Sequence, residues 1–364
     1  MSFVQVHNQP AIQKLDDATM ELRVAKYPEK AREPVLWLAA FVRNKCNREI
    51  SVLQEACKKA NISDIPDYTT FNRILIGTYF KVDEVTGRVQ GSVNNLLKIV
   101  ETLRELDRYE EDAGKTPFIE TPTWTLISNS IDKARLPQRI NKFAGIAGPT
   151  GSQKTACFKE YKARNNHGKV VYTDAPETSS LPRYTYDLAA AYFGKDGLDN
   201  STARNIRRIS NAVNPTKCII VDNVQRLYIE RMGNDQPVFN FLQKLQDDTG
   251  CTVILGFVPL FIRTLSTGVS RGYFEQFVGR MGGLRKILQL PEKPTRDDIL
   301  AIAEGFKLRD AEKHIKYLET IAHSPGLIRP LFEDLQDAKA EAEADKKPLT
   351  IDYIRMVRGE EEAA

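Results

Sequence analysis

The chain has 364 residues and a mass of 41.2 kDa, with 41% hydrophobic and 27% charged residues. This composition is typical of a globular protein with two or three domains, and it excludes a disordered or fibrous chain. The 52 basic and 48 acidic residues leave a net charge of +4, which alone does not indicate nucleic-acid binding.

The longest apolar run covers residues 35–42, whereas a membrane span needs roughly 20 residues, so neither a membrane segment nor an export signal is expected. Five scattered cysteines form no CxxC pair, and the four histidines complete no metal-ligand cluster. This pattern predicts packed, reduced thiols in a cytoplasmic protein.

The first part of the chain has helical periodicity at residues 35–42, 49–60, 69–76 and 93–106, and Gly77 is expected to end the third of these helices. Two short helices joined by the turn at 63–68 fit a helix-turn-helix unit. The start of its recognition helix would face DNA through Thr69, Thr70, Asn72 and Arg73. The alternative is a helical bundle that only packs or oligomerises.

The middle part alternates between strands and helices, and the last part is helical. The strands are expected at 143–147, 170–173, 218–221, 252–255 and 284–290, and the intervening helices at 155–164, 184–193 and around 238–247. Buried strands in this alternation predict a parallel sheet covered on both faces. The last helices are expected at 296–305, 311–322, 327–344 and 351–357.

Two breaks rich in Pro, Gly or Thr, at residues 112–124 and 291–295, separate these parts. They predict an N-terminal helical domain at 1–111, an α/β core at 112–291 and a C-terminal helical domain at 292–364.

A glycine-rich turn, GPTGSQKT at residues 148–155, follows the first strand of the core and matches the phosphate-binding loop GxxxxGK[ST] except at Gln153, which replaces the second glycine. Lys154 would bind the β- and γ-phosphates, and Thr155 would offer its hydroxyl to Mg²⁺. Backbone N–H groups of the loop and helix start would hold the phosphates. The expected nucleotide-binding residues are Gly148, Pro149, Thr150, Gly151, Ser152, Gln153, Lys154, Thr155 and Ala156. The alternative is a glycine-rich turn with an incidental Lys-Thr pair.

A second motif, CIIVDN at residues 218–223, is an apolar strand that ends in an acid. Asp222 would hold the Mg²⁺ through water, in the position of a Walker B aspartate. The next residue would normally be a Glu that deprotonates the attacking water; Asn223 can orient a water but cannot take its proton. The alternative is a buried strand that ends in a surface Asp-Asn turn.

Together these motifs resemble the AAA+ ATPases, and within them the DNA-transposition regulators of the phage Mu B type. The resemblance also rests on the segments 118–135, 170–180, 219–227, 252–261, 273–283 and 323–338, and with the front domain it covers roughly residues 45–358. It implies an α/β fold: a P-loop AAA+ parallel sheet flanked by helices, with an N-terminal helix-turn-helix domain and a C-terminal helical lid. ATP and Mg²⁺ are the implied cofactors.

The resemblance also implies roles for arginines outside the loop. Arg280 is the expected arginine finger, which would reach the γ-phosphate of a neighbouring subunit, and Arg271 is the second choice. Arg329 is the expected sensor-2 residue of the lid. Three positions depart from the family pattern, namely Gln153, Asn223 and Phe257. Phe257 stands where the sensor-1 turn usually offers a polar side chain. These departures bear on hydrolysis more than on binding.

A basic cluster lies between the second and third strands and consists of Arg183, Lys195, Arg204, Arg207 and Arg208. Phosphate contacts there would give sequence-independent, salt-sensitive DNA binding. The alternative is a solvated helix face, because adjacent residues such as Arg207 and Arg208 point in different directions.

The function implied by the resemblance is ATP-dependent, largely sequence-nonspecific binding of double-stranded DNA. The chain would form a homo-oligomer on DNA, a filament or a ring, and deliver target DNA to a transposase. The residues expected to carry ATP hydrolysis are Lys154, Asp222, Asn223, Arg280 and Arg329, and Asn223 makes weak hydrolysis the expectation. The alternatives are a nucleotide-gated scaffold or switch with little or no hydrolysis, and a helicase-loader-like ATPase.

Overall fold

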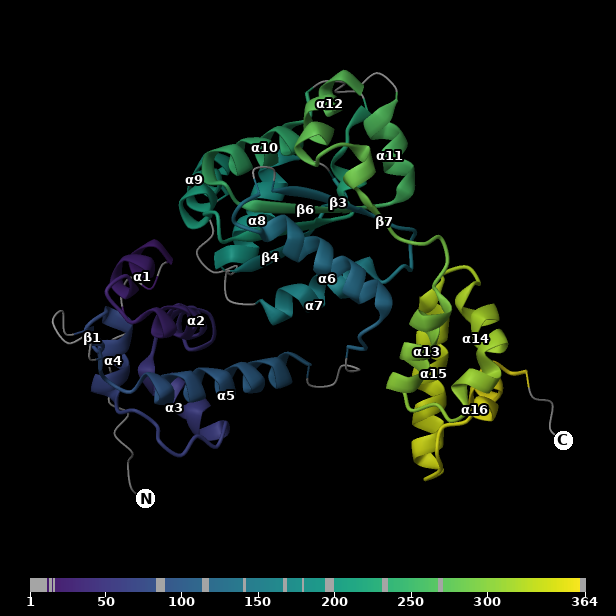
Figure 1. The fold of residues 1–364 in the computed structure, drawn as a ribbon, viewed down its shortest axis with the longest axis horizontal. Coiled ribbons are helices and arrows are strands. Elements are labelled where there is room, and N and C mark those ends of the chain that lie inside the picture. The colour runs from purple at the N-terminus through teal and green to yellow at the C-terminus, as the bar shows by residue number, and fades with distance from the viewer. Residues whose placement is uncertain are drawn as a thin grey trace.

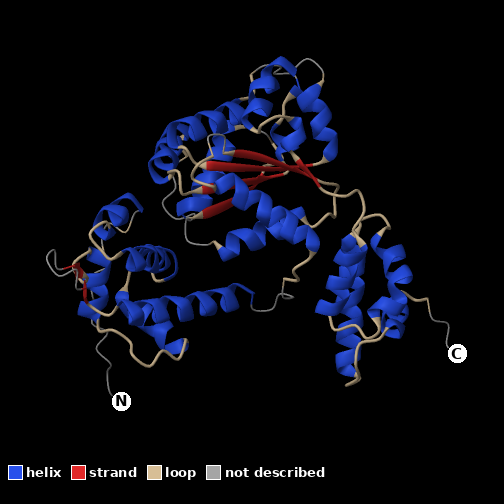
Figure 2. Ribbon diagram, viewed as in Figure 1, coloured by secondary structure: helices blue, strands red, loops and turns tan. Residues whose placement is uncertain are grey.

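Helices dominate the fold, and one parallel sheet lies in the middle of the chain (Figures 1 and 2). The computed structural model describes residues 12, 15, 17–82, 89–112, 118–139, 142–165, 169–178, 180–193, 200–230, 235–267 and 271–360. Within these ranges, no helix combines the length and the apolar character that a membrane crossing requires.

The N-terminal unit is a helical bundle with its own apolar core. Its elements are α1 (Asp17–Val24), α2 (Glu29–Lys45), α3 (Ile50–Lys59), α4 (Tyr68–Ile76), the antiparallel pair β1 (Lys81–Val82) and β2 (Val89–Gln90), and α5 (Val93–Asp112). The four predicted helices are present, and α2 and α5 are longer than predicted. Gly77 ends α4 at φ 86°, as predicted, because a residue without Cβ adopts this left-handed conformation at no steric cost.

The sheet of the middle unit has five parallel strands in the order β4-β5-β6-β3-β7. The strands are β3 (Phe143–Ala147), β4 (Val170–Asp174), β5 (Cys218–Asp222), β6 (Thr252–Phe257) and β7 (Leu288–Gln289). The first four lie where the sequence predicts them.

The predicted fifth strand at 284–290 is wrong over most of its length. Leu284–Lys286 form a 3-10 turn, and only Leu288–Gln289 pair with β3. The reason is that the backbone N–H of Ile287 bonds to the carbonyl of Leu284 at 3.2 Å, so the chain turns before it reaches the sheet edge.

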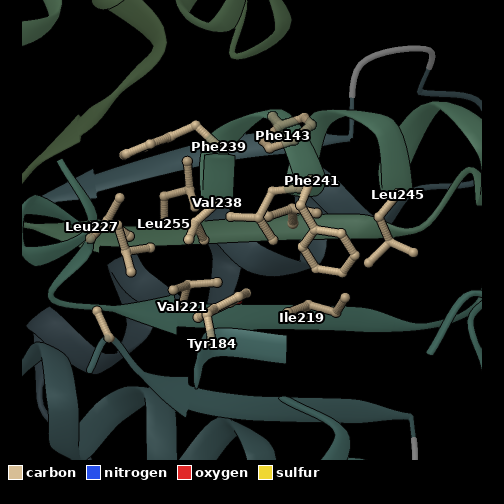
Figure 3. Packing of buried hydrophobic residues seen from close by; sticks show 14 of the residues in the cluster. Phe143, Tyr184, Ile219, Val221, Leu227, Val238, Phe239, Phe241, Leu245 and Leu255 are labelled. Atoms are coloured by element: carbon tan, nitrogen blue, oxygen red, sulfur yellow. The ribbon is translucent and has the colours of Figure 1, made fainter. Parts of the chain in front are cut away.

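Helices cover both faces of the sheet, which gives a three-layer α/β/α arrangement (Figure 1). Successive residues of β5 alternate between two apolar clusters: Ile219 and Val221 pack with side chains of α8 (Leu181–Phe193) and α10 (Pro237–Thr249), whereas Ile220 packs with those of α6 (Pro122–Arg135) and α7 (Lys154–Arg164). Figure 3 shows the first cluster, in which strand residues meet those of α10. Three further helices lie on that side: α9 (Thr202–Ala212), α11 (Pro259–Ser266) and α12 (Arg271–Arg280).

The five cysteines are all buried and unpaired. Burial raises the pKa of Cys157 to about 12, so this thiol stays protonated and packs as a small apolar group.

The C-terminal unit, which we call the lid, is a bundle of α13 (Arg296–Gly305), α14 (Ile315–Ala322), α15 (Ile328–Ala344) and α16 (Ile351–Val357) with a separate apolar core. The predicted helix at 311–322 is wrong at its start. Asp310 takes φ 54°, and Ala311–His314 form a 3-10 turn before α14 begins.

The lid is joined to the core through the buried carboxylate of Asp298, in the first turn of α13. Asp298 accepts hydrogen bonds from the backbone N–H and hydroxyl of Thr123 in α6, at 2.8 and 3.0 Å. It also accepts bonds from the backbone N–H and hydroxyl of Thr295, which caps α13, at 3.2 and 2.7 Å. One carboxylate therefore ties the starts of two helices together across the boundary between core and lid.

Polar contacts join the N-terminal unit to the core. Glu33 of α2 pairs with Lys169, next to β4, and with Arg104 of α5, both at 2.6 Å. Burial raises the pKa of Glu33, but these two cations outweigh it and hold the pKa below its usual value. A second contact joins Glu21 of α1 to Asn214 after α9 at 2.8 Å.

Candidate functional site: a nucleotide cleft between core and lid

The glycine-rich loop connects β3 to α7, as the sequence predicts. Gly151 has φ 86° and Gln153 has φ 65°, so the loop makes two left-handed turns before the helix starts. For a residue with a Cβ this conformation costs about 1 kcal/mol. Gln153 is half-buried, and its side-chain oxygen accepts a bond from the Thr121 hydroxyl at 3.3 Å. The replaced glycine is thus accommodated by a contact with the residue that caps α6.

Lys154 is folded over the loop. Its ammonium donates to the carbonyls of Gly148 and Pro149 at 2.6 and 2.9 Å and to the Ser152 hydroxyl at 3.2 Å. Burial lowers the pKa of this ammonium, and the nearby carboxylate of Asp222 opposes part of the shift. All three bonded oxygens are neutral, so the charge is available to phosphate oxygens at the loop, which is the fit that a nucleotide requires.

Thr155 and Asp222 meet as the metal prediction requires. The Thr155 hydroxyl donates to Asp222 Oδ2 at 2.5 Å, and the Asp222 side chain is 0% exposed. Asp222 Oδ1 accepts the Asn223 backbone N–H at 2.9 Å, and Tyr172 donates weakly to Oδ2 at 3.4 Å. A hydroxyl and a carboxylate that face a phosphate-binding loop are the ligand types that Mg²⁺ prefers, so the donor set fits this ion.

Asn223 follows Asp222 in a left-handed conformation, at φ 55°. Its amide nitrogen donates to Asp174 Oδ1 at 2.7 Å, and Arg226 pairs with Asp174 Oδ2 at 3.3 Å. Asp174 ends the neighbouring strand β4, in register with Asp222. Sequence reasoning assigned no role to Asp174, although the strand VVYTD ends in an acid as CIIVD does.

Lys154, Thr155 and Asn223 line a cleft of about 1290 Å³ between the core and the lid, and Asp222 and Asp174 are bonded to residues of its wall. Its polar wall contains the loop residues 150–156 together with Asn223 and Arg226. Its apolar wall was missed by sequence reasoning and contains Phe118, Ile119, Ile302, Ile328 and Phe332. A charged loop facing an apolar wall is suited to a ligand with phosphates at one end and an aromatic base at the other.

The lid reaches the loop through the turn before α15. The carbonyl oxygen of Gly326 lies so close to Gly151 that a Cβ on Gly151 would come within 2.1 Å of it. Arg329, the predicted sensor-2 residue, lines the cleft, and its exposed side chain has no hydrogen-bond or ion-pair partner among the described residues. Its guanidinium is therefore available to a ligand in the cleft.

The predicted arginine finger lies elsewhere. Arg280 ends α12 and pairs with Asp247 of α10, and neither Arg280 nor Arg271 lines the cleft of its own chain. Phe257, at the predicted sensor-1 turn, is 1% exposed and packs against Phe261. It brings no polar group to the cleft.

The predicted DNA-contacting arginines of the core are not equivalent. Arg204 and Arg207 are exposed on α9, but Arg208 lies over the ring of Phe193 at 4.7 Å, and Arg183 pairs with Asp187 on its own helix at 2.9 Å. Lys195 lies outside the described residues.

The predicted recognition helix, α4, presents two of its four predicted contact residues, because Thr70 and Asn72 are half-buried. Thr69 and Arg73 are exposed, whereas Thr70 is half-buried and its backbone N–H bonds to Asp67 Oδ1 at 2.7 Å. This carboxylate satisfies the start of α4, and its negative charge would be close to any DNA phosphate placed there.

Comparison with known proteins identifies two domains. An AAA domain matches residues 140–265, and the C-terminal domain of the Mu B transposition protein matches residues 286–358. No curated protein matches the chain.

Solved structures give distant similarities. Domain III of the replication initiation protein DnaA from Thermotoga maritima is 17% identical with a TM-score of 0.44, over 66% of this chain and 92% of that chain. Drosophila ORC bound to DNA is 11% identical with a TM-score of 0.43, over 70% of this chain and 64% of that chain. A Thermotoga maritima RuvB mutant is 15% identical with a TM-score of 0.39, over 65% and 68%. The two matched domains are consistent with an AAA+ ATPase of the phage Mu B type.

Proposed function

We propose that this protein binds ATP and Mg²⁺ in the cleft, assembles on double-stranded DNA with little sequence preference, and presents that DNA to a transposase. The observation that carries the proposal is the convergence of Lys154, Thr155 and Arg329 in one cleft, with the buried Asp222 bonded to Thr155, in a chain that also has the Mu B C-terminal domain. A nucleotide there would contact both core and lid, and so would couple nucleotide state to lid position.

Each cleft residue has a distinct part in this proposal. Lys154 would exchange its loop carbonyls for phosphate oxygens, and Arg329 would reach the same phosphates from the lid. Thr155 and Asp222 would hold Mg²⁺, which neutralises phosphate charge when bound. Arg280 would leave Asp247 to reach the cleft of a neighbouring subunit in an oligomer, whether filament or ring, which makes assembly and nucleotide binding interdependent.

DNA contact is proposed for the exposed side of α9 and for α4. Arg204 and Arg207 would bind phosphates in a sequence-independent way, with contributions from Arg183 and Lys195. We also propose that α3 and α4 act as a helix-turn-helix, within domains bounded at 1–111, 112–291 and 292–364.

A second candidate function is a nucleotide-gated scaffold or switch that assembles without hydrolysis. Asn223 favours it, because an amide stands where a catalytic Glu is expected.

The test measures nucleotide binding and DNA assembly on the same samples of purified full-length protein. A fluorescent ATP analogue reports binding, and anisotropy of two labelled duplexes of unrelated sequence reports DNA assembly, each with ATP, with ADP and with no nucleotide. The wild type is expected to bind both duplexes tightly only with ATP and Mg²⁺. Lys154→Ala is expected to lose ATP binding and assembly together.

Two results would contradict the proposal. One is DNA assembly that is the same with and without nucleotide. The other is a strong preference for one duplex, because phosphate contacts carry no sequence information. Lys133→Ala is the matched control, since Lys133 is exposed on α6 of the same core and does not line the cleft.

A further inference from the structure

Asp174 is an acid beside the Walker B strand that the family pattern leaves without a role. Strands β4 and β5 are parallel neighbours with Asp174 opposite Asp222, so the two carboxylates leave the same edge of the sheet. Asp222 is fully buried and bonded to Thr155, whereas the Asp174 side chain is 51% exposed. The second carboxylate is therefore open to water where the first is not.

Two residues that line the cleft hold the Asp174 carboxylate. The Asn223 amide donates to Oδ1 at 2.7 Å and Arg226 contacts Oδ2 at 3.3 Å. The carboxylate itself does not line the cleft, but it is one hydrogen bond from Asn223, the cleft residue that occupies the position of the expected Glu. A carboxylate oxygen accepts more than one hydrogen bond, so Oδ1 can bind a water while it keeps Asn223.

We propose that Asp174 is the general base of ATP hydrolysis in this protein, with Asn223 orienting the same water. This inference rests on the proposed nucleotide site. The catalytic acid is expected directly after Asp222, where this chain has the amide Asn223. Here the acid is Asp174, at the end of the adjacent strand β4. Asn223 alone cannot take a proton, but an amide and a carboxylate together can orient a water and deprotonate it.

The step balances with these groups. The water oxygen forms a bond to the γ-phosphorus, and the bond from this phosphorus to the bridging oxygen breaks, with its electron pair left on ADP. One water proton passes to Oδ1 of Asp174 and is then released to solvent, and inorganic phosphate leaves.

The experiment compares phosphate release in the presence of duplex DNA, and binding of a fluorescent ATP analogue, for four forms of the full-length protein. Asp174→Asn keeps the size and the acceptor for Asn223 but not the base, so turnover is expected to fall about 100-fold or more with binding unchanged. The double variant Asp174→Asn with Asn223→Glu, which exchanges acid and amide, is expected to recover turnover. Asp248→Asn is the control, because this acid on α10 is 52% exposed and paired with Lys244.

Turnover by Asp174→Asn close to that of the wild type would overturn the inference, because a residue that only positions Asn223 would be replaced by the isosteric amide. A wild type that binds the nucleotide and assembles on DNA but releases no phosphate would also overturn it, and would leave the proposed DNA-binding function standing. A wild type that binds no nucleotide would instead refute the proposed function itself, and this inference with it.

Discussion

Replacement of Asp298 by Ala is expected to detach the lid from the core. The substitution removes the acceptor of four hydrogen bonds, two from Thr123 at 2.8 and 3.0 Å and two from Thr295 at 3.2 and 2.7 Å. Thr123 is 6% exposed, so its backbone N–H and hydroxyl would remain buried without a partner. Thr295 is exposed and can bond to water instead.

The magnitude follows from this difference in burial. Hydrogen bonds to a charged group contribute about 1.5–3 kcal/mol each, and only the two from Thr123 count in full. The helix cap that Asp298 completes with Thr295 adds about 1 kcal/mol. The expected loss is therefore about 4–7 kcal/mol in the free energy that holds α13 against α6.

Hydrogen exchange followed by mass spectrometry measures this loss locally. Peptides from the starts of α6 and α13 should exchange much faster in Asp298→Ala, while peptides from α2 and α5 in the N-terminal unit should not change. Asp297→Ala is the matched control, because Asp297 is exposed in the same helix turn. Asp298→Asn should lie between the two, since its amide keeps one acceptor oxygen. If Asp298→Ala and Asp297→Ala exchanged alike, the reasoning that assigns the junction to this carboxylate would be refuted.

Three further expectations concern the loop and the unit contacts. Gly151→Ala should displace the lid, because its Cβ would come within 2.1 Å of the Gly326 carbonyl oxygen. Gly279→Ala should not, because its Cβ would have no atom within 4 Å. The measurement is the protease sensitivity of the lid, and equal sensitivity of the two variants would contradict the contact. Gln153→Val should lower the melting temperature and Gln153→Gly should not, because a β-branched residue is strained at φ 65°. An unchanged melting temperature for Gln153→Val would refute this reasoning. For Glu33, whose pKa is lowered in the fold, the stabilising contribution should be present above the unfolded pKa of about 4.3 and lost as pH falls through the folded pKa. Because Glu33 is 41% exposed, this contribution should be below about 1 kcal/mol and should weaken with salt. The stability of Glu33→Gln and wild type in urea should therefore differ at pH 7 and converge at pH 3. A difference that grows as the pH falls would exclude the ion pair.

The sequence predicts those parts of the site that are encoded locally. The loop at 148–155 and the strand that ends in Asp222 combine a short pattern with a strand-to-helix turn, so the Thr155–Asp222 contact could be expected from two motifs alone. The parallel sheet follows likewise from buried strands that alternate with helices.

Contacts between segments far apart in the sequence could not be predicted in the same way. The Asp174–Asn223 bond depends on the register of two strands, which a single strand pattern does not specify. The Thr123–Asp298 bond depends on how the lid packs, although the Thr295–Asp298 spacing does indicate a capping box. The fifth strand was overestimated because an apolar run shows burial but not whether a partner strand extends along it.

The strand order has a consequence for how the protein forms during synthesis. Strand β3, which carries the glycine-rich loop, pairs with β6 and β7, and Phe143 lies opposite Val253, more than a hundred residues later in the chain. When β3 leaves the ribosome it has no strand to pair with, whereas the helices of the N-terminal unit already have their partners. Non-local pairing of this kind is slow and leaves apolar edges exposed while it waits. We therefore expect the N-terminal unit to fold first on the ribosome and the nucleotide loop to become ordered only after β6 has been made.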